Sequence, residues 1–292
     1  MKRVACLLVA ATVASGCGGA DEPAGPASRP FVAPDPGAVH VHGLGVNPAD
    51  GALFVATHTG LFRAGPGEDV ARRVAGRYQD TMGFTVVGPD RFLGSGHPDL
   101  RERKPPYLGL IVSGDAGSTW KPVSLYGKAD FHVLESAGDR VVGYGSDFAS
   151  RRQQLLVSDD AGRSWEKRRP PGPLIDLALS PANPDVWVAS TARALFRTAD
   201  GGRTWQPLNG AGGLLAWRAP TELVRAGGRG QVSVSSDGGS SWREVGDIGG
   251  QPAALEGEDD ALYAALHDGV IKRSRDGGRT WSVRSRPQPT EG

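Results

Sequence analysis

Short apolar runs separated by turn residues follow one another along most of this chain. One stretch has apolar runs at 175–179, 185–189 and 194–197, and a fourth run begins at Trp205. Runs of this length bounded by Gly, Pro and Asp are typical of β-strands, and no helical periodicity is sustained after residue 20. The same unit occurs six times, at 39–76, 80–124, 129–168, 172–208, 213–246 and 250–285. The pattern therefore predicts an all-β chain of six four-stranded units.

An eight-residue box follows the third run of the last five units. It reads (S/T)-x-D-x-G-x-(S/T)-W and ends at Trp120, Trp165, Trp205, Trp242 and Trp281. A period of about 40 residues is a signature of a repeat architecture. Ser, Thr and Asp side chains bond backbone amides in turns, glycine accepts backbone angles that other residues resist, and tryptophan supplies an apolar wedge. We therefore interpret the boxes as turns of the scaffold.

The box resembles the Asp-box, or BNR, repeat of sialidases and related β-propellers. The resemblance implies a turn between the third and fourth strands of a blade, on the face away from the active site. It implies a six-bladed β-propeller of four-stranded antiparallel blades over residues 39–285. The first unit has only a degenerate box, at 64–70. Because the first and last units each contain four runs, we expect no strand exchange at ring closure.

The first 17 residues have the order of a bacterial export signal. Lys2 and Arg3 precede an apolar run at 4–13, which is too short to span a bilayer as a permanent helix. The segment ASGC at 14–17 resembles a lipobox, which implies cleavage before Cys17 and lipidation of that residue. Ordinary signal cleavage, which gives a free secreted protein, is the alternative. The expected organisation is a signal peptide at 1–16, a flexible tether at 17–38, the propeller, and a disordered tail at 286–292.

Composition narrows the classes of partner. The chain has 292 residues and a net charge of +1, which gives no support for nucleic-acid binding. Its only cysteines are Cys6 and Cys17, so the predicted propeller has no disulfide and depends on burial and strand pairing. We expect a monomer in the bacterial cell envelope, extracytoplasmic and held at the membrane through lipidated Cys17.

Three of the six histidines occupy one equivalent blade position. A gapless alignment of the second runs places His58, His97 and His267 in register. Their units are the first, second and sixth, which are consecutive around a closed ring. Other polar candidates lie at the start of first runs: His40, His42, His132, Asp80, Met82 and Asp130. First strands line the channel of a propeller, so we predict that all six histidines face one ligand-binding region.

A metal ion is one ligand that this set of residues predicts. Neutral imidazole is the commonest protein ligand of Zn and Cu, and methionine favours reduced copper. The predicted metal ligands are His58, His97, His267 and His42, with Zn or Cu as the ion. Two alternatives stay open, namely a polar or catalytic histidine site without metal and a set of unrelated structural histidines.

The sialidase resemblance does not extend to an active site. Sialidases hold the substrate carboxylate with three arginines and attack with a tyrosine, but the Arg-Ile-Pro segment and a matching tyrosine motif are absent. Whether the chain is an enzyme stays open. If it is one, a sialidase-like glycoside hydrolase is expected, and the candidate carboxylates are Asp80, Asp130 and Asp99, followed by Asp147 and Glu135.

The chain also resembles bacterial Asp-box lipoproteins that are loosely described as glycosyl hydrolases. The resemblance lies in HVHGL at 40–44, THTGLFR at 57–63 and SGHPD at 95–99. A more distant likeness is to propellers that assist the assembly of membrane complexes. Three functions are therefore open: binding of a metal ion or a small polar or carbohydrate ligand, glycoside hydrolysis, and a non-catalytic interaction scaffold.

Overall fold

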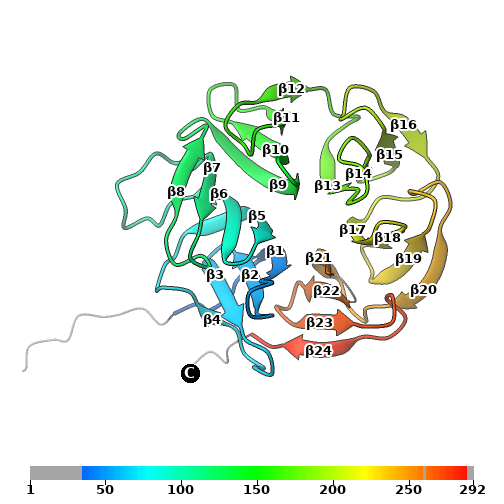
Figure 1. Ribbon diagram of the computed structural model, residues 1–292. Helices are drawn as coiled ribbons and strands as arrows, with labels where there is room; N and C mark the ends of the chain where they lie inside the picture. Colours follow the sequence, from blue (N-terminus) through cyan, green and yellow to red (C-terminus); the bar gives the residue numbers. More distant parts are fainter. Residues whose placement is uncertain (1–34, 259–260, 288–292) are drawn as a thin grey trace, which may run out of the picture. The chain divides into compact units, whose positions relative to one another are not determined.

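Six four-stranded sheets make up the part of the chain that the computed structural model describes, residues 35–258 and 261–287. Within each sheet, strands that follow one another in sequence are neighbours and run antiparallel. The sheets stand as blades around a central axis, and the first strand of each blade is innermost (Figure 1). The prediction of an all-β, six-bladed propeller is confirmed.

The strands of each blade have the following bounds. Blades 1 to 3 consist of β1 (Val41–Val46), β2 (Leu53–Thr57), β3 (Gly60–Ala64) and β4 (Arg72–Arg73); β5 (Asp80–Gly88), β6 (Arg91–His97), β7 (Leu110–Ser113) and β8 (Lys121–Ser124); and β9 (Ala129–Ala137), β10 (Arg140–Asp147), β11 (Gln153–Ser158) and β12 (Glu166–Arg168). Blades 4 to 6 consist of β13 (Leu174–Leu179), β14 (Trp187–Thr191), β15 (Leu195–Thr198) and β16 (Gln206–Leu208); β17 (Leu214–Ala219), β18 (Glu222–Ala226), β19 (Gln231–Ser235) and β20 (Arg243–Asp247); and β21 (Pro252–Glu258), β22 (Ala261–Leu266), β23 (Ile271–Ser274) and β24 (Ser282–Ser285).

The first strands β1, β5, β9, β13, β17 and β21 contact one another in sequence and close a ring around a channel. Their approach is close enough to require glycine at some positions. A Cβ atom on Gly83 of β5 would lie 2.7 Å from the carbonyl oxygen of Phe131, and one on Gly257 of β21 would lie 2.7 Å from that of Trp217. Glycine at these positions keeps the channel narrow.

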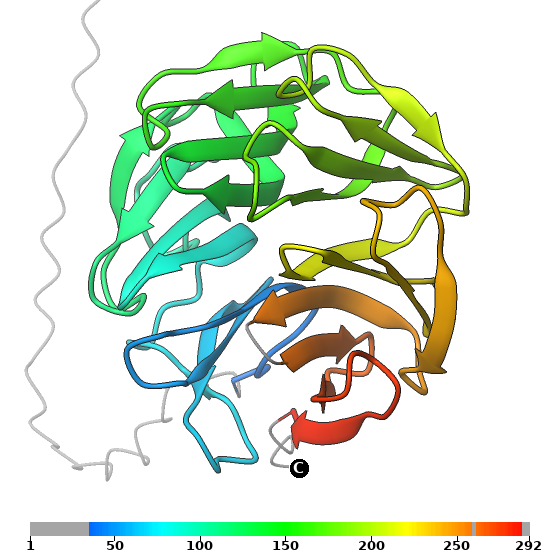
Figure 2. The same ribbon diagram turned by 45° about the vertical axis from the view of Figure 1, so that its right-hand side comes forward.

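In the described part of the chain each blade takes its four strands from one continuous stretch, so ring closure there uses no exchanged strand, as expected from the first and last units. The fourth strand of blade 6 and the residue after it instead bond to the loop before β4. The Arg284 guanidinium donates to the carbonyl oxygens of Glu68 and Gly65, and the Arg286 N–H donates to Asp69 O. Figure 2 shows blades 1 and 6 next to each other at this closure. Backbone and guanidinium hydrogen bonds therefore join the two ends of the ring.

The five boxes form one repeated turn between the third and fourth strands. In blade 4, Thr198 Oγ1 accepts the N–H of Gly202, while Asp200 accepts the N–H and hydroxyl of Thr204. Gly202 has φ +79°, and a Cβ there would lie 2.6 Å from the Trp187 ring. The same bonds recur in the other four boxes. We refer to these as the box turns.

Aromatic side chains fill the space between adjacent blades. Phe54 of blade 1 and Phe92 of blade 2 are fully buried, with ring centroids 4.7 Å apart. Trp187 of blade 4 is also fully buried, in a cluster shared with blade 3. Burial stabilises by about 1.5–3 kcal/mol for each large apolar side chain. The propeller is thus stabilised by apolar contacts from blade to blade.

The predicted signal peptide at 1–16, Cys17 and most of the tether lie outside the described residues. No helix formed by the described residues has the length and apolar character needed to cross a bilayer.

Candidate functional site

A β-bulge near the start of the first strand re-aims one side chain in each of three consecutive blades. The bulged residues are His42 in β1, Met82 in β5 and His132 in β9. A bulge leaves its extra residue unpaired and turns the side chain out of the regular alternation. Blades 4 and 6 have the same bulge, but with Ile175 and Ala253. The bulge thus recurs in five blades, and the bulged residue is a histidine in blades 1 and 3.

A second polar side chain stands two residues before each of these bulges. The three residues are His40 in blade 1, Asp80 in blade 2 and Asp130 in blade 3. Asp80 pairs with His97 across β5 and β6, and the carbonyl oxygen of His40 accepts the N–H of His58. The starts of first strands and the ends of second strands thus share one end of the channel, opposite the box turns. We call this end the histidine mouth.

His42, His58 and Asp80 form what we call the first His–Asp cluster. His58 Nδ1 lies 2.9 Å from Asp80 Oδ2, and His42 Nε2 lies 3.6 Å from Asp80 Oδ1. The two imidazole centroids are 6.2 Å apart. The Asp80 side chain is 10% exposed, whereas that of His58 is 60% exposed. A buried carboxylate of blade 2 therefore lies between two imidazoles of blade 1.

His97, His132 and Asp130 form the second His–Asp cluster, one blade further on. Asp130 Oδ2 lies 2.9 Å from His132 Nε2 and 3.4 Å from His97 Nε2. His97 Nδ1 also lies 2.7 Å from the carbonyl oxygen of Pro106, which can only accept. In a neutral His97 ring, Nδ1 therefore carries the hydrogen, and Nε2 is an acceptor that faces the Asp130 carboxylate. A proton or another cation between Nε2 and the carboxylate would be stabilised by both groups.

Burial and neighbouring charges separate the protonation states of these groups. Burial, followed by the charge of His58, lowers the pKa of His42 to about 4. Burial raises the pKa of Asp80, while His58 and His97 oppose that rise. The hydrogen bond to Asp130 raises the pKa of His132. His42 is consequently neutral at physiological pH, which is the form of imidazole that binds metal ions.

Three buried polar atoms of the histidine mouth have no hydrogen-bond partner among the described residues: His42 Nε2, Asp80 Oδ1 and Asp130 Oδ1. Most buried polar atoms in proteins are paired, so such atoms call for a ligand or an ordered water. Each residue of the first His–Asp cluster offers one ligand atom, and these atoms lie within 4.8 Å of one another. Two imidazoles and one carboxylate suit Zn²⁺, Cu²⁺ or Fe²⁺ with coordination positions left open.

The other two histidines lie beside this group but outside it. The His40 ring centroid is 6.3 Å from that of His58. His267 is exposed, and together with His40 and His42 it lines a cavity of about 430 Å³. The structure thus brings His42 and His58 together with Asp80 as one set of potential ligands, while His97 belongs to the second cluster and His267 to neither.

Two of the candidate carboxylates have structural partners. Asp99 accepts hydrogen bonds from the Arg101 guanidinium and from the N–H of Tyr78, and the first of these holds its pKa well below the usual range. Asp147 accepts the N–H of Ser150 in the β10–β11 loop. Both side chains order loops. Glu135 lies deeper in the channel, together with Asp176 and Glu256. The sequence analysis named Glu135 but not Asp176 or Glu256, because a single carboxylate within a first run forms no motif.

No protein-family model matches the chain. A curated protein, photosystem II assembly lipoprotein Ycf48 of Nostoc sp. (strain PCC 7120 / SAG 25.82 / UTEX 2576), is 25% identical over 184 residues, which cover 63% of this chain and 49% of that protein. The chain thus spans about half the length of this curated relative.

Solved structures with a similar backbone include two other propellers. A GH74 xyloglucanase from Xanthomonas campestris has a TM-score of 0.55 and 18% identity, covering 86% of this chain and 46% of that one. A structure of YCF48 bound to D1 peptide has a TM-score of 0.45 and 17% identity, covering 72% and 84%. The xyloglucanase similarity supports the propeller fold and, at this identity, nothing more.

Proposed function

We propose that this chain is an exported, lipid-anchored β-propeller that binds a divalent transition-metal ion at the histidine mouth. The observation that carries the proposal is the convergence of His42, His58 and Asp80 with ligand atoms within 4.8 Å of one another. The unpaired buried atoms His42 Nε2 and Asp80 Oδ1 support it, because a bound cation would satisfy both.

In this proposal the ligands come from two blades and are ready to bind. His42 is neutral, and Asp80 lies within 2.9 Å of His58 before any ion arrives. Little side-chain ordering is then needed on binding, which favours affinity. The second His–Asp cluster supplies a further carboxylate, Asp130, whose Oδ1 is also buried and unpaired. It could orient water or a small polar ligand next to the ion.

Metal analysis and calorimetric titration of the purified full-length protein test this function. We expect one equivalent of Zn²⁺ or Cu²⁺ per chain and loss of binding in His58→Ala. His267→Gln is the matched control, because it removes an exposed imidazole beside the cluster without removing a ligand. Equal metal affinity in the wild type and in His58→Ala, or equal loss in His267→Gln, would contradict the proposal.

Membrane anchoring rests on Cys17 and on the lipobox-like segment before it, both outside the described residues. The 25%-identical curated relative is itself described as a lipoprotein, which is consistent with anchoring. Cys17→Ser is expected to move the protein from the membrane fraction to the soluble fraction after export. Retention of this variant in the membrane fraction would contradict lipidation at Cys17.

A second candidate is an assembly function for a membrane protein complex. It is favoured by the curated relative, whose name describes a photosystem II assembly lipoprotein. The candidate predicts that crosslinking in intact membranes captures subunits of one membrane complex, and that His58→Ala does not reduce the yield. Loss of capture in His58→Ala would instead link any partner to the metal site.

Glycoside hydrolysis is the remaining alternative, and it rests on the Asp-box resemblance of the sequence. Of the candidate aspartates, Asp80 and Asp130 remain for this role, since Asp99 is bonded to Arg101 and Asp147 to the N–H of Ser150. Hydrolysis of chromogenic glycosides or sialosides that is lost in Asp80→Asn would support it, and activity no greater than that of boiled protein would oppose it.

A further inference from the structure

A second cavity, separate from the first His–Asp cluster, occupies the channel toward the face of the box turns. It has a volume of about 550 Å³, and five of the six first strands contribute to its wall. The β9–β10 turn and the β13–β14 loop, with Pro181 and Pro184, line its opening. A volume of about 300–1,000 Å³ is typical of small-molecule sites.

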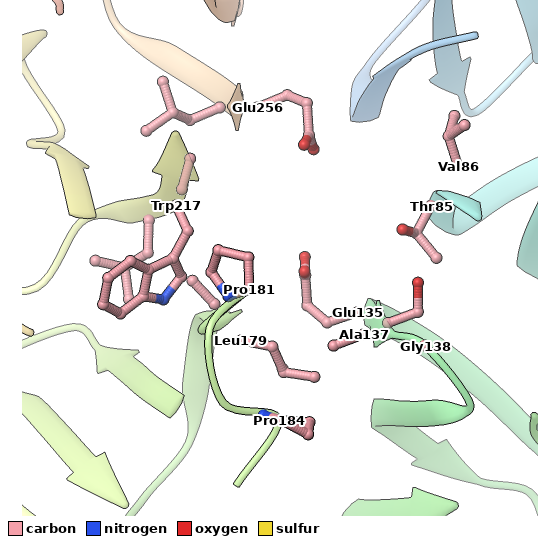
Figure 3. A pocket seen from close by; sticks show the side chains of 15 residues that line it. Thr85, Val86, Glu135, Ala137, Gly138, Leu179, Pro181, Pro184, Trp217 and Glu256 are labelled. Atoms are coloured by element: carbon pink, nitrogen blue, oxygen red, sulfur yellow. The ribbon is translucent and has the colours of Figure 1, made fainter. Parts of the chain in front are cut away.

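Two carboxyl groups point into this cavity from opposite sides. Figure 3 shows Glu135 of β9 and Glu256 of β21 directed toward one another across the open space. Among the described residues, no Lys, Arg or His side chain forms a hydrogen bond or an ion pair with either glutamate, and the backbone N–H of Gly257 donates to Glu256. Both glutamates also line a smaller cavity that reaches His42 and His132, so they lie between this cavity and the histidine mouth.

The electrostatics of the cavity are those of an acidic site that lacks a counterion. Burial, followed by the charge of Glu258, raises the pKa of Glu256 to about 8. Burial, followed by Glu256 and Asp176, also raises the pKa of Glu135. Within residues 35–258 and 261–287, no cationic side chain acts on either carboxyl group. A positive charge supplied from outside the chain would therefore be stabilised here.

Besides the two glutamates, Thr85 and Ser136 contribute hydroxyl groups to the wall, and the other side chains that line it are apolar. Figure 3 shows Trp217 of β17 on the side of Pro181 and Leu179, with Val86 on the opposite side of the open space. The indole Nε1 of Trp217 is buried and has no partner among the described residues. Aromatic and aliphatic walls bind the apolar stem of a ligand, and an aromatic face attracts a cation.

We infer that this cavity binds an organic cation, a guanidinium or primary ammonium group on a short apolar stem, between Glu135 and Glu256. When the cation binds, Glu256 releases its proton to solvent, so that the carboxylates take the charged head and the apolar side chains of the wall take the stem. A bare metal ion would leave that wall without a partner, and an anion would meet two carboxyl groups. The same head can come from a free small amine or from an Arg or Lys side chain of a peptide.

Calorimetric titration of the purified full-length protein with butylguanidinium, butylammonium and neutral 1-butanol tests this inference. The two cations are expected to bind with 1:1 stoichiometry, and Glu135→Gln and Glu256→Gln are each expected to weaken binding by at least about 10-fold through loss of a charge-assisted hydrogen bond. Glu244→Gln, at an exposed position of strand β20, is the matched control and should change affinity less than about two-fold. His58→Ala should have no effect, so this test is independent of metal binding.

Peptides distinguish the two sources of the cation. If acetyl-Gly-Arg-Gly-amide binds more tightly than butylguanidinium, and its Gln analogue does not bind, the ligand is a basic side chain of a partner. If the free cation binds at least as well as the peptide, the ligand is a small amine. Cations that bind no more tightly than 1-butanol, or Gln variants that bind like the wild type with unchanged melting temperature, would overturn the inference.

Discussion

The box turns and the histidine mouth are both built around aspartates at opposite ends of the same blades, but their hydrogen bonding differs. In the last box, Asp276 accepts bonds from the Thr280 N–H and hydroxyl and from the Ser274 hydroxyl. At the mouth, Asp80 and Asp130 each keep one buried oxygen without a partner. A fully bonded aspartate stabilises a turn, whereas a buried, partly bonded one beside imidazoles is arranged for a ligand.

The largest expected effect is on metal affinity, when the same substitution is made in the two regions. Asp80→Asn removes a ligand charge, so the affinity for Zn²⁺ should fall by at least about 100-fold. Asp200→Asn changes the corresponding atoms in a box turn and should leave the affinity within about two-fold, since Asp200 lies at the opposite end of the blades. Zinc titration of both variants decides; similar losses in both would remove the functional distinction between the regions.

The next effect is on stability and is confined to the box turns. Thr198 is buried, and its hydroxyl oxygen accepts the buried N–H of Gly202. Thr198→Val keeps the shape but leaves that N–H unpaired, which should lower the free energy of unfolding by about 1–3 kcal/mol. Chemical denaturation measures this. Zinc affinity should not change, and a Thr198→Val protein as stable as the wild type would show that the box bonds are not structural.

Alkaline pH should destabilise the protein through the buried carboxyl groups of the channel, and acid pH through the aspartates of the box turns. The pKa of Glu256 is raised to about 8 and that of Asp176 to about 7. At a pH above the ordinary carboxyl range and below these values, both groups therefore hold a proton in the folded state that they have released in the unfolded chain. Their contribution to stability is complete below the ordinary carboxyl range and is lost as the pH rises through 7 to 8. The facing groups are Glu135 and Glu258, which are also acidic.

The aspartates of the box turns make stability depend on pH in the opposite direction. Hydrogen bonds, first of all from Thr204, lower the pKa of Asp200, so its contribution is present at neutral pH and lost as the pH falls below the ordinary carboxyl range. Melting temperatures recorded from acid to alkaline pH should therefore decline on both sides. Glu256→Gln should reduce only the alkaline decline, and an unchanged alkaline side in this variant would contradict the assignment.

The smallest expected effect compares the two His–Asp clusters. His97 contacts Asp130 and lies outside the first His–Asp cluster. His97→Gln should therefore lower zinc affinity by no more than about 10-fold, the low end of the range for residues that support a metal ligand, because the ion pair of His97 is with Asp130 and not with a proposed ligand. Zinc titration beside His58→Ala provides the measurement. A loss as large as that in His58→Ala would indicate that both clusters hold one shared ion.

The fold could be predicted from the sequence because one sequence pattern recurs in each blade. Each box lies between the third and fourth strands of one blade, so the five boxes and the unit before them indicate six blades. All six sheets contain the predicted runs. Strand pairing within a blade is local, and no long-range information was needed.

The histidine mouth could be predicted only in part. The alignment of His58, His97 and His267 correctly indicates equivalent positions at the ends of β2, β6 and β22. The partner of each, however, comes from the next blade: Asp80 for His58 and Asp130 for His97. The corresponding residue next to His267 is His40, which is not an acid. Contacts between blades, and the bulge that re-aims His42, depend on packing that no local pattern records.

The most direct test of the account is anomalous diffraction at the zinc edge from crystals grown with Zn²⁺. A peak is expected within about 2.0–2.2 Å of one ring nitrogen each of His42 and His58 and of one oxygen of Asp80. A map with no peak at these three residues, or with zinc only at exposed His267, would contradict it.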